Sequence, residues 1–193
     1  MSFLNLEKDI QTYVKELPTS NSVTVGFFLD VSLPYESSEL NGISHFLEHM
    51  CFRGTKNRTA YEITKAIDSL GGYINAYTSK EFTCYYVTIL PENLAEGLDI
   101  LIDVVFNSVF AEDDVKLEKS IIGEEIKMYE DTPDEKIMDM FNNELFENSY
   151  LGNPILGTQN TISLLNSDKL KLFHQHYFST SNIKCVVAGK ILD

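Results

Sequence analysis

The chain has 193 residues, a length that fits one domain with a substantial core, and 44% of its residues are hydrophobic, which argues against a disordered chain. Its formal net charge of −14 argues against nucleic acid as a partner, since phosphate groups are bound by basic surfaces. No apolar run approaches the length of a membrane span, and the first residues resemble neither a signal peptide nor an organelle presequence. Three widely spaced cysteines fit free thiols in a reducing compartment. We therefore expect a cytoplasmic protein that forms one domain over residues 1–193.

The order of apolar and polar residues predicts a sheet. After a polar first segment, residues 22–33 alternate apolar and polar side chains, which is typical of a strand with one face on a core. Residues 73–77 and 82–90 are two further expected strands, joined as a hairpin by the polar turn TSKE, and residues 183–188 form a closing strand. The predicted fold class is α+β, with a largely antiparallel sheet covered by helices.

Helices are expected between these strands. Gly54 ends the first of them. Two later helices begin with a capping box, formed by Thr59 with Glu62 and by Thr132 with Glu135. The expected helices lie within residues 41–55, 59–70, a stretch that begins at Pro91, 112–130, 133–148, and a last segment that follows the turn-rich loop SYLGNPILGTQN and ends near residue 178.

The stretch NGISHFLEHMCFRGT, residues 41–55, carries the clearest chemical signal. At about 100° per residue, His45 and His49 lie one helical turn apart and Glu48 lies beside them, so the three side chains can converge. Neutral imidazole nitrogens bind zinc, and a catalytic zinc site keeps one position open for a water molecule that a carboxylate can deprotonate. His45 and His49 are therefore the expected ligands and Glu48 the expected base, in the order HxxEH.

A zinc site of this kind needs a third protein ligand. On the expected helix over residues 112–130, Glu118 and Glu125 lie near the centre of the apolar face, whereas Glu124 lies toward its edge. A carboxylate aimed into a core is costly unless it is paired or bound to a metal, so two such carboxylates on one line indicate a cation. Periodicity alone leaves open which of the two binds it. We assign Glu125 as the ligand and Glu118 as a supporting or proton-handling carboxylate.

Other side chains that bind metals fit this site less well. His174 and His176 are two residues apart, so on a helix they point to different faces, and a surface or helix-end position is expected for them. Cys84 falls within an expected strand, where a small buried core residue is the expected role.

Several motifs together resemble the inverzincin metallopeptidases of the pitrilysin and insulinase type. The resemblance is nearest to bacterial relatives of the β subunit of the mitochondrial processing peptidase, and it is carried in order by NGISHFLEHMCFRGT, GGYINAYTSKEFTCYY, KSIIGEEIKMYEDTPDE, NPILGTQNTI and VVAGKILD. It implies a zinc endopeptidase with one zinc ion held by His45, His49 and Glu125. It further implies that Glu48 activates the attacking water and that Glu118 assists catalysis.

The resemblance also implies how substrate binds and what else the active unit contains. Asn75 and Ala76 match the edge strand to which the backbone of an extended peptide substrate adds. Members of the family are longer chains whose paired domains close around the peptide, and this sequence matches the first, HxxEH-bearing domain. A second family domain or a homologous subunit is therefore the expected partner.

Two other functions compete with a peptidase. The first is a structural or assembly subunit that keeps the fold without the chemistry, against which the intact His45, Glu48, His49 and Glu125 argue. The second is a carbon–sulfur lyase of the S-ribosylhomocysteine type, which also uses HxxEH but completes its metal site with cysteine. Cys84 is the residue that keeps the second alternative open.

Overall fold

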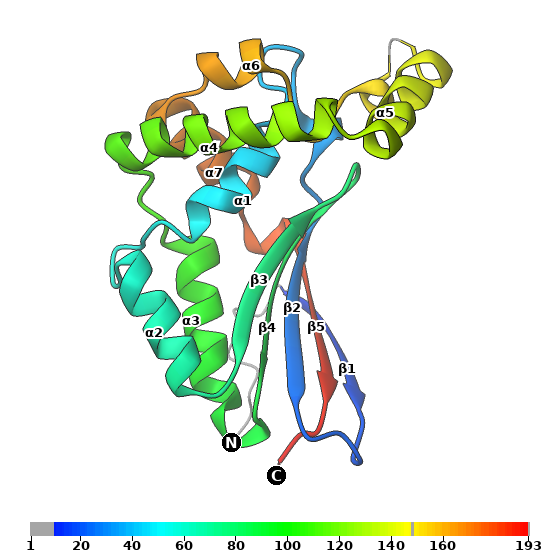
Figure 1. The fold of residues 1–193 in the computed structure, drawn as a ribbon. Helices are drawn as coiled ribbons and strands as arrows, with labels where there is room; N and C mark the ends of the chain where they lie inside the picture. Colours follow the sequence, from blue (N-terminus) through cyan, green and yellow to red (C-terminus); the bar gives the residue numbers. More distant parts are fainter. Residues whose placement is uncertain (1–9, 148, 193) are drawn as a thin grey trace.

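The computed structural model describes residues 10–147 and 149–192, which form one mixed sheet with helices over one face and across one end (Figure 1). The strands lie in the order β1-β5-β2-β4-β3. β1 and β5 are parallel, and the other three neighbouring pairs are antiparallel. The predicted α+β class and largely antiparallel sheet are therefore confirmed. The strands are β1 (Gln11–Glu16), β2 (Val23–Leu29), β3 (Tyr73–Thr78), β4 (Thr83–Ile89) and β5 (Ile183–Gly189).

The helices fall into two groups around this sheet (Figure 1). The group that covers one face of the sheet contains α2 (Ala60–Ser69) and α3 (Leu94–Phe106). The group at the end of the sheet contains α1 (Ile43–Cys51), α4 (Glu112–Glu130), α5 (Pro133–Leu145), α6 (Gln159–Leu164) and α7 (Ser167–Tyr177). Within residues 10–147 and 149–192, no helix combines the length and the apolar character that crossing a membrane requires.

The observed elements differ from the expected ones in three places. β1 was not predicted, because its residues are almost all exposed and show no periodic burial. The last expected helix is two helices, α6 and α7, with Leu165 and Asn166 between them. The capping box predicted at Thr132 is wrong: its hydroxyl donates to Met128 O, one turn back in α4, at 2.8 Å and does not cap α5. The capping box at Thr59 is confirmed.

α1 is fixed at both its apolar face and the segment that follows it. Phe46, Leu47 and Met50 are at most 1% exposed and anchor the helix in the core. The loop after α1 is tied to α3 through the buried carboxylate of Asp103. That carboxylate accepts hydrogen bonds from Thr55 Oγ1 at 2.7 Å, from Asn57 Nδ2 at 2.6 Å and from Arg58 Nη1 at 2.7 Å. The helix that carries HxxEH is therefore held rigidly at the end of the sheet.

Candidate metal centre

The two histidines and the glutamate of α1 lie on the side of the helix that faces α4 and the end of β3. The rings of His45 and His49 are neighbours, with centroids 4.6 Å apart. The apolar residues of α1 occupy the remaining face, so burying them turns the histidines toward α4, which packs against α1. The helical spacing of the sequence thus places these side chains together on one face of α1, and burial of the apolar face turns that group toward α4.

Glu125 of α4 meets both histidines. Its Oε1 lies 3.8 Å from His45 Nε2, and its Oε2 lies 3.6 Å from His49 Nε2. One ligand atom from each of the three residues falls within 4.8 Å of the other two. Two ligand atoms bound to one zinc ion at tetrahedral angles are about 3.4 Å apart. The three side chains therefore fit a zinc ion after small movements, and this group is the one capable of holding a metal among the residues that the structure describes.

The electrostatics of the group also suit a cation. Burial, reinforced by the neighbouring His49, lowers the pKa of His45 to about 3, so its ring is neutral as a metal ligand must be. Burial lowers the pKa of His49, but the carboxylates around it, Glu118 first, outweigh that effect and raise it. Burial also raises the pKa of Glu125. The carboxylates of Glu48, Glu118 and Glu125 gather here around one arginine, Arg53, and this excess of acidic groups favours a bound cation.

Glu118 supports His49 from behind. Its carboxylate is 2% exposed and accepts hydrogen bonds from His49 Nδ1 at 2.8 Å and from Arg53 Nε at 2.5 Å. Burial would raise the pKa of Glu118, but these two hydrogen bonds and the charges of Arg53 and His49 together outweigh it and lower the pKa. Because the ionised carboxylate accepts from Nδ1, the hydrogen of the His49 ring lies there. Nε2, which lies 3.6 Å from Glu125 Oε2, is then the nitrogen through which the neutral ring would bind a metal ion.

Arg53 and Thr78 are two residues of this site that sequence reasoning missed. Arg53 lies four residues after His49, about one helical turn. The signal that could have found it is the buried Glu118, which needs a positively charged partner. Thr78, the last residue of β3, donates a hydrogen bond to Glu48 Oε2. No local pattern indicates that contact, since the two residues belong to different elements. Burial raises the pKa of Glu48, with the Thr78 hydrogen bond opposing it.

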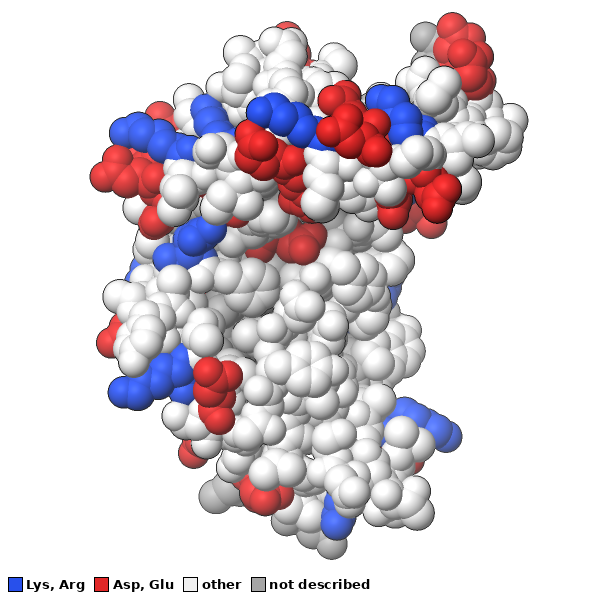
Figure 2. All heavy atoms as spheres, in the orientation of Figure 1, with Lys and Arg blue, Asp and Glu red and all other residues white. Residues whose placement is uncertain are grey.

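The strand that contains Asn75 and Ala76 has a free edge. β3 is the outermost strand on its side of the sheet and lies beside α1. The Ala76 N–H donates to the side-chain oxygen of Asn75 at 2.9 Å, so this amide points to the open edge and not to β4. Figure 2 shows that charged side chains gather along the upper helices, whereas the sheet below them is nearly free of charge. The edge beside α1 thus offers main-chain groups on a largely uncharged surface.

The alternative ligands lie elsewhere. His174 lies in the last turn of α7, at the helix end as expected, but it is buried and not on the surface, and its Nε2 lies 2.7 Å from Val105 O. Cys84 is buried, as expected, and its thiol lies beside the hydroxyl of Tyr77. Neither residue belongs to the metal-capable group, which contains no cysteine within the described residues.

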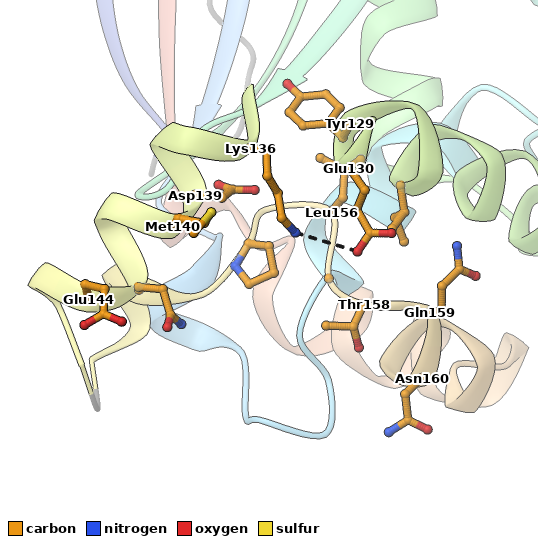
Figure 3. A pocket seen from close by; sticks show the side chains of 15 residues that line it. Tyr129, Glu130, Lys136, Asp139, Met140, Glu144, Leu156, Thr158, Gln159 and Asn160 are labelled. Carbon is orange, nitrogen blue, oxygen red and sulfur yellow. Dashed lines mark ion pairs between the residues drawn. The ribbon is translucent and has the colours of Figure 1, made fainter. Parts of the chain in front are cut away.

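A cavity of about 580 Å³ lies at the far end of α4 (Figure 3). Its walls are the last turn of α4, one side of α5 and residues 152–160. Lys136 and Glu130 face each other there at 3.8 Å. None of the residues of the metal-capable group lines the cavity, although both features share α4.

Comparison with known proteins agrees with this geometry. Residues 12–159 match the family model described as Insulinase (Peptidase family M16). The chain belongs to the M16 family. A Bacillus subtilis relative, named as the uncharacterized zinc protease YmxG, is 42% identical over 187 residues, which are 97% of this chain and 46% of that protein. This chain therefore spans about half the length of the curated M16 relatives that it matches.

Solved structures share the fold closely. A protease from Helicobacter pylori superposes with a TM-score of 0.90 at 25% identity, over 97% of this chain and 45% of that chain. A structure described as a peptidase M16 inactive domain from Pseudomonas fluorescens superposes with a TM-score of 0.88 at 13% identity, over 96% of this chain and 45% of that chain. The M16 fold thus accommodates an inactive domain, so activity has to be argued from the side chains of the site.

Proposed function

We propose that this chain is the zinc-binding half of an M16 endopeptidase, with His45, His49 and Glu125 as the zinc ligands. The observation that carries the proposal is the convergence of these three side chains from two helices, with Glu48 beside them. When bound, zinc supplies Lewis acidity toward a water molecule and the substrate carbonyl.

Glu48 is the proton-handling group in this proposal. Its carboxylate is half-buried, and burial raises its pKa, which makes it a stronger base than an exposed glutamate. The hydroxyl of Thr78 holds one of its oxygens, so the other oxygen is available to accept the proton of the attacking water. Glu48 then donates that proton to the amine that leaves when the peptide bond breaks. Glu118 assists by holding His49 in place through Nδ1.

The free edge of β3 is the proposed binding site for the peptide backbone. An extended peptide that pairs with this edge would use main-chain hydrogen bonds, which accept many sequences. Thr78 joins the end of this strand to Glu48, so a peptide on β3 runs beside the base. The Ala76 N–H now donates to the side chain of Asn75, and a bound peptide would take over that hydrogen bond with one of its own carbonyl groups.

The active unit in this proposal includes a second domain. The chain covers 46% of its Bacillus subtilis relative, and a second M16 domain or a homologous subunit would close over β3 from the open side. The rival is a non-catalytic subunit, and the inactive Pseudomonas fluorescens domain is the observation that favours it.

The test is the variant Glu48→Gln, assayed in the complete assembly. We expect it to bind zinc as the parent does and to lose peptide cleavage, because the amide cannot accept the proton. Zinc content by elemental analysis and cleavage of an unstructured peptide give the two readouts. Full cleavage by Glu48→Gln would refute the mechanism, and a parent that binds zinc but cleaves no peptide would favour the non-catalytic subunit.

A further inference from the structure

The helix that carries the two histidines has no cap of its own. α1 has only nine residues, its N-cap residue is Gly42, and its first turn contains no acidic side chain. The N–H groups at the start of a helix lack partners within that helix, and a negative charge there also complements the helix dipole. A helix this short needs acceptors from elsewhere in the chain to hold its first turn.

Glu36, in the loop before α1, supplies these acceptors. Its Oε2 accepts a hydrogen bond from Gly42 N at 2.8 Å, and its Oε1 accepts one from Ser44 N at 3.0 Å. The side-chain amide of Asn41 donates to the same carboxylate at 3.1 Å. One carboxylate thus holds two amides at the start of α1, and His45 is the next residue along the helix.

The loop that carries Glu36 is itself fixed to a distant segment. Asn41 Nδ2 donates to Pro154 O at 3.0 Å. Gly42 has a φ of 93°, and a Cβ there would lie 2.6 Å from a backbone oxygen of the facing segment. A Cβ on Gly157 would lie 2.4 Å from Asn41 O. The backbone around Gly42 thus packs directly against the backbone around Gly157, which fixes the loop before α1 in place. Since Glu36 belongs to this loop, its hydrogen bonds connect the start of α1 to the body of the protein.

His45 depends on this support more than His49 does. The ring of His49 is held through Nδ1 by Glu118 at 2.8 Å. His45 Nδ1 is buried and has no hydrogen-bond partner within residues 10–147 and 149–192. Histidines that bind metal usually donate their second nitrogen to a group that fixes the ring. The direction of the His45 ring therefore follows from packing and from the position of the first turn of α1.

We propose that Glu36 is a positioning residue for the metal site. By holding the first turn of α1, it keeps His45 Nε2 directed at Glu125, 3.8 Å away. The inference rests on the proposed zinc site and extends it to a residue outside the two helices that carry the ligands.

The test compares the zinc affinity of Glu36→Gln and Glu62→Gln in the full chain, by competition with a chromogenic chelator. Glu62 is the matched control, because it also holds a helix start, accepting from Thr59 N at 2.8 Å on α2. Glutamine keeps one acceptor oxygen, so each variant loses part of a cap. We expect zinc affinity to fall about tenfold in Glu36→Gln, as for other groups that support metal ligands, and to match the parent in Glu62→Gln.

Cobalt(II) in place of zinc gives a second readout, since its visible absorption depends on the geometry of its ligands. The spectrum should change in Glu36→Gln and not in Glu62→Gln. A parent that binds neither metal overturns the zinc site and this inference together, whereas parental zinc affinity in Glu36→Gln overturns the inference alone. If Glu36→Gln fails to fold, Glu36→Asp replaces it, because the shorter side chain cannot span both amides, and parental affinity there overturns the inference equally.

Discussion

Replacing Glu118 with glutamine tests how a buried carboxylate prepares His49 to bind metal. In the parent, both carboxylate oxygens accept hydrogen bonds, one from His49 Nδ1 at 2.8 Å and one from Arg53 Nε at 2.5 Å. Glutamine offers one acceptor oxygen and an NH₂ donor, so one of these two donors would face another donor. If the oxygen stays with Arg53, the hydrogen of the His49 ring is free to move to Nε2, the atom that faces Glu125.

The expected loss of zinc affinity in Glu118→Gln is about 10- to 100-fold, the usual effect of removing the partner of a metal-binding histidine. This corresponds to about 1.4–2.8 kcal/mol of binding free energy. A buried donor left without an acceptor costs about 1–3 kcal/mol of folding free energy as well. The two effects are measured separately, because urea unfolding of the metal-free protein reports only the second.

Glu124→Gln is the matched control, since it is the same substitution on the same helix. Glu124 is exposed and pairs with Lys127 at 2.6 Å, away from the metal-capable group, so the zinc affinity of Glu124→Gln should equal that of the parent. Chelator competition measures the affinity of both variants, and nitrogen-15 NMR of the imidazole reports which nitrogen of His49 carries the hydrogen. Equal zinc affinity in Glu118→Gln and Glu124→Gln, with the His49 hydrogen still on Nδ1, would refute the reasoning.

Three further changes test other parts of the structure. Glu125→Ala removes an expected ligand, so zinc should bind more weakly than in Glu118→Gln, and parental affinity in the chelator assay would show that another group completes the site. Thr78→Val removes the hydroxyl that holds Glu48 and should lower kcat for peptide cleavage by about tenfold at unchanged zinc affinity, whereas an effect on KM alone would contradict that role. Burial raises the pKa of Asp103, but hydrogen bonds from four side chains outweigh it and lower the pKa below its ordinary value of 3.8. The ionised carboxylate therefore stabilises the fold above pH 3.8, and this stabilisation is lost as the pH falls through the lowered pKa of the folded protein. Asp103→Asn should therefore cost about 2 kcal/mol at neutral pH and flatten the acid dependence of urea unfolding, and an unchanged acid dependence would assign that loss to other groups.

Local sequence patterns were enough for the elements whose contacts are local. α4 begins at Glu112 and ends at Glu130 as predicted, and the capping box at Thr59 forms, because helix periodicity and caps involve residues a few positions apart. β1 escaped prediction because its pairing partner, β5, comes from the other end of the chain and its side chains stay exposed. Thr132 does not cap α5: its hydroxyl is turned back toward α4, where it donates to Met128 O.

The sequence by itself determined that one short helix carries His45, Glu48 and His49 on one side, and that a second helix carries Glu118 and Glu125 on one line. Both statements follow from the fixed rotation per residue of a helix. The tertiary structure alone decided which carboxylate meets which nitrogen: Glu125 faces the Nε2 atoms of both histidines, and Glu118 faces His49 Nδ1. The spacing could not decide this, because the offset between two crossing helices is set by packing among residues far apart in the chain.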